Sequence, residues 1–231
     1  MATAKPTLPS CPSTGDRWQT YSSTGGSGAF NFGVGTDTPI QADFDGDGKT
    51  DAAVFRKDDP SAGLATFYIR RSSDSSYYAV AFGVSTDIPA PADYDGDGRA
   101  DIGVWRSSNQ TFYSTNSSNN VLQTPSLGSA AASATKTVSA DYDGDGKADY
   151  AVYDPSTANW YIRQSTTSTV TTTQWGSGGD TPVQNDYDGD GKVDLATWAN
   201  GDWHIKKSTG GTRDEHWGMA GDIPVPAFYR R

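Results

Sequence analysis

Residues 43–51 read Asp-Phe-Asp-Gly-Asp-Gly-Lys-Thr-Asp, and this stretch decides the fold because four versions of it occur in the chain. The four stretches begin at residues 43, 93, 141 and 186 and share the pattern D-[FY]-D-G-D-G-[KR]-x-D. Carboxylates at positions 1, 3, 5 and 9 can converge if the backbone curls around one point, and the glycines at positions 4 and 6 permit the positive φ angles of such a curl. Oxygen ligands on a flexible loop favour Ca²⁺ over Mg²⁺, which prefers stricter geometry. The sequence therefore predicts four Ca²⁺ sites.

Each predicted site uses the four aspartates of its loop and the backbone carbonyl of the Lys or Arg at position 7. The pattern D-G-D-G also forms ordinary solvated turns, but all four aspartates are present in every one of the four stretches, which favours metal binding. An EF-hand is excluded because position 12 is Val or Thr rather than Glu, and because strand-like sequence follows each loop. The predicted ligands are Asp43, Asp45, Asp47, Lys49, Asp51, Asp93, Asp95, Asp97, Arg99, Asp101, Asp141, Asp143, Asp145, Lys147, Asp149, Asp186, Asp188, Asp190, Lys192 and Asp194.

The charge of the chain is concentrated in these loops. Sixteen of the 28 acidic residues lie there, and four divalent cations would carry eight positive charges against a net charge of −10. The acidity therefore reflects coordination chemistry and excludes nucleic acid as a partner. No segment is apolar for long enough to insert into a membrane. Since free Ca²⁺ is typical of the extracellular space, we expect a secreted or surface-exposed protein whose signal peptide has been removed.

Two further markers recur five times each and define a repeat. One is an aromatic residue or Leu followed by Gly, and the other is an aromatic residue that opens a strand. Loop starts are 50, 48 and 45 residues apart, a length that suits four-stranded propeller blades. The third repeat lacks the Asp-x-Pro-x segment that precedes the other loops and has a run of small residues, Ser129 to Ala134, in its place. The aromatic-Gly markers begin at Phe32, Phe82, Leu127, Trp175 and Trp217, and the strand-opening markers are Trp18, Phe67, Phe112, Trp160 and Trp203.

The two ends of the chain carry complementary partial repeats. Residues 222–231 resemble the first strand of a unit, and residues 17–33 resemble its last two strands. A ring closed by pairing of the N- and C-terminal strands would leave no open sheet edge. We therefore predict an all-β, five-bladed β-propeller with four-stranded blades. Its domain spans 17–231 after a Pro/Ser/Thr-rich leader at 1–16, which holds the single cysteine, Cys11. The predicted blades are about 37–83, 87–128, 135–176, 180–218, and 222–231 with 17–33.

With these motifs the chain resembles the FG-GAP/VCBS repeat family, the calcium-binding propeller repeats also found in integrin α chains. The resemblance spans about residues 17–229. It implies one Ca²⁺ in the loop between the first and second strand of each complete blade. Integrin-type propellers have seven blades, so the five predicted here are more similar to small lectin propellers.

The resemblance implies an extracellular binding or adhesion module, and we expect carbohydrate binding. Aromatic faces recognise sugars, and Trp105, Trp198 and Trp203 are the candidates for exposed platforms, although the regular recurrence of Trp is also what packing between blades predicts. The partners would then be glycans or cell-surface proteins, and self-association remains open. One alternative is a structural surface or filament subunit, and a second is an accessory or catalytic domain of polysaccharide degradation.

The sequence predicts no catalytic residues. His204 and His216 are the only histidines, and neither belongs to an H-E-x-x-H pattern. Glu215 precedes His216, but adjacent strand residues point to opposite faces. Asp154 and Asp202 lie outside the loops, with nothing that marks them as catalytic. We therefore expect that the protein is not an enzyme.

Overall fold

The computed structural model describes residues 17–21, 27–60 and 62–224. They form four four-stranded antiparallel sheets and one two-stranded sheet, and the only helical segment among them is a 3-10 turn, η1 (Ser129–Ala131). The predicted leader at 1–16, with Cys11, lies outside the described residues.

Successive strands along the chain pair with one another, as in propeller blades. The two-stranded sheet consists of β1 (Arg17–Tyr21) and β2 (Ser27–Asn31). Blade one contains β3 (Thr38–Ala42), β4 (Asp51–Arg56), β5 (Thr66–Arg70) and β6 (Tyr77–Ala81). Blade two contains β7 (Ile88–Pro89), β8 (Ile102–Arg106), β9 (Thr111–Thr115) and β10 (Leu122–Gln123). Blade three contains β11 (Lys136–Thr137), β12 (Tyr150–Asp154), β13 (Asn159–Arg163) and β14 (Val170–Gln174). Blade four contains β15 (Thr181–Pro182), β16 (Leu195–Ala199), β17 (Asp202–Lys206) and β18 (Thr212–His216).

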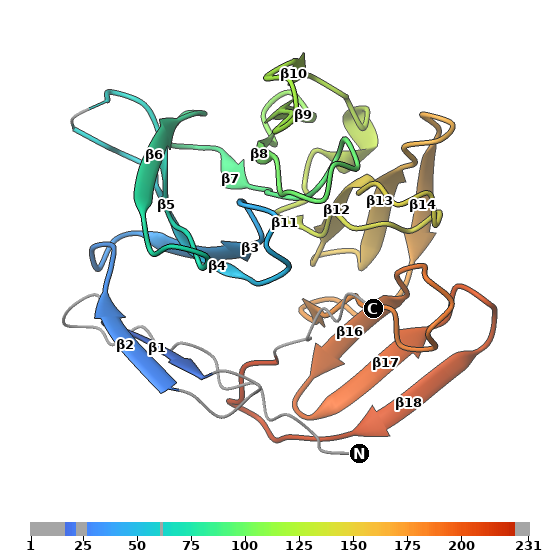
Figure 1. The fold of residues 1–231 in the computed structure, drawn as a ribbon. Coiled ribbons are helices and arrows are strands. Elements are labelled where there is room, and N and C mark those ends of the chain that lie inside the picture. Colours follow the sequence, from blue (N-terminus) through green and yellow to red (C-terminus); the bar gives the residue numbers. More distant parts are fainter. Residues whose placement is uncertain (1–16, 22–26, 61, 225–231) are drawn as a thin grey trace.

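The sheets are arranged around a common centre, with β1 and β2 between blade one and blade four (Figure 1). The all-β propeller with four-stranded blades is therefore confirmed, but the number of five such blades is wrong, because the described residues form four. The fifth was expected to take its first strand from 222–231. Residues 222–224 form no strand, and residues 225–231 lie outside the described part of the chain, as does the predicted closure of the ring there.

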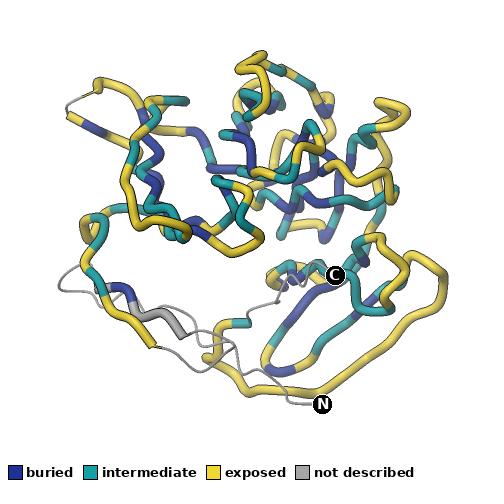
Figure 2. The backbone as a smooth tube through the Cα atoms, in the orientation of Figure 1, coloured by how far each residue is buried: buried dark blue, intermediate teal, exposed yellow. Residues whose placement is uncertain are grey.

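Aromatic and β-branched side chains pair across the strands inside each blade. In blade one Phe55 on β4 lies opposite Phe67 on β5, with ring centroids 4.9 Å apart, and both are fully buried. Burial follows the position of a strand in its blade, since β16 is largely buried whereas every residue of β18 is exposed (Figure 2). The first three strands of a blade therefore supply most of its core.

Apolar clusters also join each blade to the next. Phe55 and Phe67 of blade one pack in one cluster with Ala100 and Val104 of blade two. Trp105 of blade two likewise belongs to a cluster with residues of blade three. Neighbouring blades thus share their cores, and this packing sets the positions of the loops at the blade ends.

Candidate metal centres

The four Asp-rich loops connect the first and second strands of blades one to four, as predicted. In all four loops the glycines at positions 4 and 6 have φ between +79° and +89°, which is the curl expected from the sequence. In the first loop, Asp43 accepts hydrogen bonds from the Gly46 amide at 2.7 Å and the Gly48 amide at 2.9 Å. Equivalent bonds recur in the other three loops. The carboxylate at position 1 therefore holds the loop closed around itself.

Carboxylates at positions 1, 3 and 9 converge in every loop, with ligand atoms within 4.8 Å of one another. The four clusters are Asp43, Asp45 and Asp51; Asp93, Asp95 and Asp101; Asp141, Asp143 and Asp149; Asp186, Asp188 and Asp194. The aspartate at position 5 is not part of these clusters, and in the first loop Asp47 instead accepts a hydrogen bond from the hydroxyl of Ser72 at 2.9 Å. Its coordination, like that by the carbonyl at position 7, stays a prediction.

Two buried carboxylate oxygens in these clusters lack a hydrogen-bond donor. Asp143 Oδ1 and Asp188 Oδ1, both at position 3, are covered from solvent and have no partner among the described residues. A buried acceptor without a partner costs about 1–3 kcal/mol, and more when it is charged. A cation in the cluster would satisfy these oxygens, so the residues present fit a hard, oxygen-liganded metal ion.

The carboxylate at position 9 is the most deeply placed of each cluster. Burial raises the pKa of Asp101 to about 6, and the nearby carboxylate of Asp95 adds to this rise. Burial raises the pKa of Asp149 to about 6 in the same way, with Asp143 contributing. The raised pKa values reflect carboxylates that are poorly solvated and close to other carboxylates, and a bound cation would stabilise their charged forms.

A Ser-Ser or Ser-Thr pair supports each cluster from the turn after the third strand of the same blade. In blade one Ser72 donates from its amide to Asp51 at 2.7 Å and from its hydroxyl to Asp47, and the Ser73 hydroxyl donates to Asp45 at 2.6 Å. The pairs are Ser72 and Ser73, Ser117 and Ser118, Ser165 and Thr166, and Ser208 and Thr209, each with the same pattern of bonds. These hydroxyl pairs were not predicted from the sequence. The recurring hydroxyl pair after each third strand was the signal that could have identified them.

The aromatic residue at position 2 anchors three of the loops to the first strand of their blade. The hydroxyl of Tyr94 donates to the carbonyl of Ala90 at 2.8 Å, and that of Tyr142 donates to the carbonyl of Val138 at 2.6 Å. Tyr187 makes the equivalent bond in blade four. Each of these three loops is therefore held at its base by the tyrosine, at its side by the hydroxyl pair, and internally by the carboxylate at position 1.

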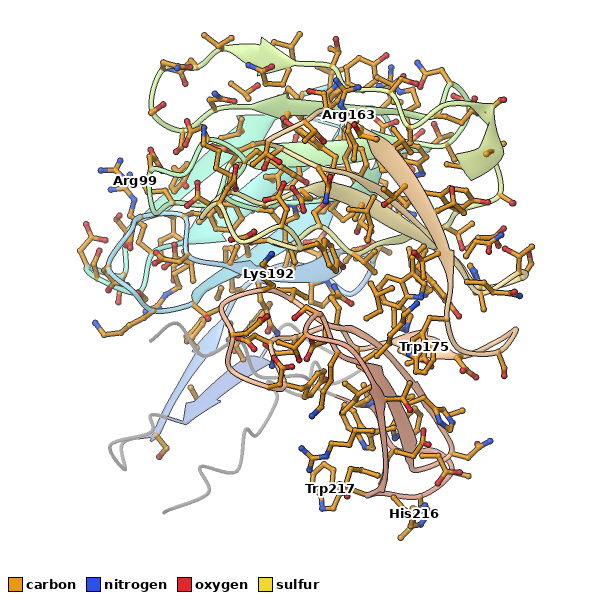
Figure 3. The ribbon with its side chains drawn as sticks, turned by 90° about the vertical axis from the view of Figure 1, so that its right-hand side faces the viewer. Arg99, Arg163, Trp175, Lys192, His216 and Trp217 are labelled. Atoms are coloured by element: carbon orange, nitrogen blue, oxygen red, sulfur yellow. The ribbon has the colours of Figure 1, made fainter. Side chains whose placement is uncertain are left out.

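The tryptophans proposed as exposed platforms are mostly buried. Trp105 has no exposed surface and donates from its indole to the carbonyl of Ala134 at 3.1 Å, and Trp198 is 8% exposed. The prediction is therefore wrong for these two, because Trp105 packs against residues of blade three and Trp198 packs within the core of blade four. Trp203 is half-buried and donates to the carbonyl of Trp217 at 3.0 Å. Trp217, which was not among the predicted platforms, is 73% exposed at the end of blade four, near His216 (Figure 3).

The two histidines form separate pairs with aspartates across β17 and β18. His204 Nδ1 lies 2.8 Å from Asp214 Oδ1, and His216 Nδ1 lies 2.6 Å from Asp202 Oδ1. Glu215 instead accepts a hydrogen bond from Arg213 at 2.8 Å. The adjacent residues Glu215 and His216 are thus not partners of one another.

A polar groove runs between blades two and three. Its volume is about 520 Å³, and its walls include the half-buried ring of Tyr150, the amide side chains of Gln123 and Gln164, and the cationic side chains of Lys147 and Arg163. The ring of Tyr150 stacks on Tyr94 with centroids 4.1 Å apart and planes inclined by 8°. The groove therefore offers a fixed aromatic ring beside several hydrogen-bonding groups.

Comparison with known proteins agrees with the fold and the loops. The FG-GAP-like repeat family model matches residues 93–152 and 141–197. The chain therefore contains FG-GAP-like repeats, and the resemblance predicted from its loops is confirmed. No curated protein matches the sequence.

Solved structures with a similar fold include two lyases. A streptogramin B lyase superposes with a TM-score of 0.55 at 10% identity, over 91% of this chain and 64% of the lyase. The selenomethionine-substituted virginiamycin B lyase from Staphylococcus aureus has a TM-score of 0.55 at 9% identity, over 91% of this chain and 65% of the lyase. This chain thus spans less than two thirds of either lyase, and at such low identity the likeness concerns the fold alone. Among the described residues, no helix has the length and apolar character that a membrane span requires.

Proposed function

We propose that the protein is an extracellular calcium-binding β-propeller that serves as a binding or adhesion module, with one structural Ca²⁺ in each of its four Asp-rich loops. The observation that carries the metal assignment is the pair of buried, unpartnered oxygens on Asp143 and Asp188, each inside a cluster of three carboxylates. The aspartate at position 5 and the carbonyl at position 7 would complete each coordination sphere. Oxygen-only ligands on a curled loop favour Ca²⁺ over Mg²⁺.

Calorimetric titration of the full, chelator-treated chain tests this assignment. We expect about four Ca²⁺ ions per chain and much weaker binding of Mg²⁺. A variant with Asp143→Asn and Asp145→Asn should lose one ion, whereas Asp214→Asn, which changes an exposed carboxylate outside the loops, should keep all four. Absence of Ca²⁺ binding by the folded wild-type chain would refute the assignment.

Carbohydrates are the ligand class that we propose for the module. The groove between blades two and three supports this, because a stacked tyrosine ring, two amide side chains and two cations suit a polar ligand with flat sugar faces. A glycan array, probed with and without excess chelator, provides the test. Binding by the calcium-loaded chain that is reduced by Tyr150→Ala together with Arg163→Ala, but not by Trp217→Ala, would place the ligand in this groove.

The alternative is a structural surface or filament subunit that has no small ligand. A well-folded, calcium-loaded chain that binds no glycan but assembles in light scattering would support it. A role in polysaccharide degradation would instead require release of sugar products, and we propose no catalysis. Dependence on Ca²⁺ favours a secreted or surface-exposed location, where the free ion is abundant, and we propose glycans or cell-surface proteins as the partners there.

A further inference from the structure

The second, third and fourth metal loops are each hydrogen-bonded to the loop of the preceding blade. The amide of Ala100 donates to the carbonyl of Asp43 at 2.6 Å, and the amide of Ala148 donates to the carbonyl of Asp93 at 2.7 Å. The amide of Val193 donates to the carbonyl of Asp141 at 2.8 Å. In each case position 8 of one loop contacts position 1 of the loop before it. The same bond therefore occurs three times along the chain.

The cationic side chain at position 7 makes a second contact between the same loops. A methyl group added to Gly46, at position 4 of the first loop, would lie 3.0 Å from Cγ of Arg99 in the second. The corresponding distances are 3.1 Å from Gly96 to Cγ of Lys147 and 3.0 Å from Gly144 to Cε of Lys192. The aliphatic stem of each cationic side chain thus covers the glycine turn of the preceding loop, as permitted by the absence of a side chain there.

Burial at position 8 agrees with this docking. Ala100 and Ala148 are each 8% exposed, and Ala100 belongs to the apolar cluster of blade one. Thr50 occupies position 8 of the first loop, which has no preceding loop among the described residues, and it is exposed. Position 8 is apolar in each of the three loops that rest on another loop.

The positions joined by these contacts are the ones that would hold the metal. Position 1 supplies a carboxylate to its own cluster while its carbonyl receives the bond from the next loop. Position 8 lies between the predicted carbonyl ligand at position 7 and the clustered carboxylate at position 9. Ordering one loop around a cation therefore also restrains a ligand residue of the neighbouring loop.

We infer that the four metal loops are coupled in series, so that a cation bound in one loop raises the affinity of the loops it touches. This inference rests on the proposed function, because it concerns the same Ca²⁺ sites. The coupling joins loop one to two, two to three, and three to four. Arg99, Lys147 and Lys192 act as positioning residues for the preceding loop, in addition to offering a carbonyl to their own. Arg99 lies at an edge of the molecule far from Trp217 and His216 (Figure 3). The contact between loops one and two is therefore separate from the exposed Trp217 at the end of blade four.

Silencing one loop tests whether its neighbours respond. Asp95→Asn with Asp97→Asn would abolish metal binding by loop two, which touches two other loops. Asp45→Asn with Asp47→Asn would abolish metal binding by loop one, which touches one described loop. Calorimetry of both variants and of the wild type gives the number and affinity of the remaining sites. We expect the mean affinity of these sites to fall by about fivefold or more when loop two is silenced, a coupling of ordinary size, and by less when loop one is silenced.

A second variant tests the contact without removing a carboxylate. Lys147→Ala keeps its backbone carbonyl but removes the stem that covers Gly96, so the Hill coefficient, expected above 1 in the wild type, should decrease. Lys49→Ala is the matched control, since Lys49 has the same position in loop one but is 72% exposed and pairs with Asp47 of its own loop. Lys147→Met, which keeps most of the stem without the charge, should behave like the wild type.

The outcomes separate the two proposals. No Ca²⁺ binding by the folded wild type would refute the metal sites themselves. Four sites that bind with a Hill coefficient of 1 and keep their affinity after silencing of loop two would leave the metal sites in place and overturn the coupling. Circular dichroism in excess Ca²⁺ shows whether each silenced variant folds. If one does not, the comparison of Lys147→Ala with Lys49→Ala tests the coupling instead. Equal binding isotherms for these two variants would overturn the coupling.

Discussion

Arg106 donates two hydrogen bonds to Asp87, from Nε to Oδ1 at 2.8 Å and from Nη2 to Oδ2 at 2.7 Å. The side chain of Asp87 has no exposed surface. Arg56 and Asp37 form the same pair in blade one. In both blades the arginine is the last residue of the second strand, and the aspartate is the residue immediately before the first strand. The pair therefore acts as a clamp: it fixes the residue before the first strand of a blade to the end of the second strand.

In blade three, different residues connect the segment before the first strand to the end of the second strand. Asp154 replaces the arginine at the end of β12 and accepts a hydrogen bond from the hydroxyl of Ser133 at 2.6 Å. Ser133 belongs to the run of small residues in which the Asp-x-Pro-x segment is missing. The departure of the third repeat is thus explained, because the acidic partner has moved from one side of the contact to the other.

Loss of the arginine should destabilise blade two. Arg106→Leu would leave Asp87 buried and without its cation, which costs about 3–5 kcal/mol when a pair is fully buried and less here because Arg106 is 26% exposed. We expect a loss of about 2 kcal/mol in urea unfolding at saturating Ca²⁺. Arg213→Leu is the control, since its pair with Glu215 is half exposed on both sides and such pairs contribute about 0–1 kcal/mol. Equal losses in the two variants would contradict the clamp.

Acid should remove the contribution of Asp154. Burial alone would raise the pKa of Asp154, but hydrogen bonds from Ser133, Ser156 and Thr157 outweigh it and hold the pKa at about 2. Because this lies below the unfolded value of about 3.9, the carboxylate stabilises the fold above pH ~4, and that stabilisation is lost as the pH falls toward 2.

The variant Asp154→Asn tests this pH dependence. It should lose roughly 2 kcal/mol at neutral pH, with the difference from the wild type shrinking as the pH falls below 4. Unfolding curves recorded between pH 7 and pH 3 measure this convergence. A constant gap over that range would show that the charge of Asp154 is not responsible.

Removal of calcium should lower the thermal stability of the whole propeller. A site held at 100 times its dissociation constant contributes about 2.7 kcal/mol, and in a chain of this length each kcal/mol changes Tm by about 2–4 °C. With four coupled loops, we expect excess chelator to lower Tm by at least about 10 °C in a calorimetric scan. An unchanged Tm would contradict structural Ca²⁺.

The hydroxyl pairs should tune metal affinity without being ligands of the cation. Ser165→Ala with Thr166→Val removes the hydroxyl bonds to Asp145 and Asp143, so these carboxylates lose their orientation. Outer-shell changes of this kind typically cost 10–100-fold in metal affinity, and we expect a loss of about tenfold for the site in blade three. Thr172→Ala, an exposed position on β14, is the control and should bind as the wild type does. Equal affinities of both variants would assign the pairs a role only in the turn.

The loops and the blades could be predicted because their signals are local and repeated. Two glycines at fixed places in nine residues determine the curl, and markers recurring about every 48 residues reveal the four-stranded unit. The exposure of Trp105 and Trp198 was mispredicted because the packing partners of a side chain are distant in sequence: Trp105 lies in a cluster with residues of blade three, and Trp198 lies in the core of blade four. The hydroxyl pairs were not predicted because Ser72 is 21 residues from Asp51 in the sequence, and only folding brings the two residues together. The blade count depended on strands at the chain ends, where the repeat is incomplete.

The contact between successive loops has a consequence for how such a chain can grow. Each repeat carries both halves of the contact, a carbonyl at its first loop position and an amide at its eighth. A tandem duplication of one repeat would therefore create a unit that already fits its parent on one side and its neighbour on the other. Selection would then act strongly on the nine loop residues and weakly on the outermost strand, and within this chain the loops are nearly identical whereas β6, β10, β14 and β18 differ widely in sequence.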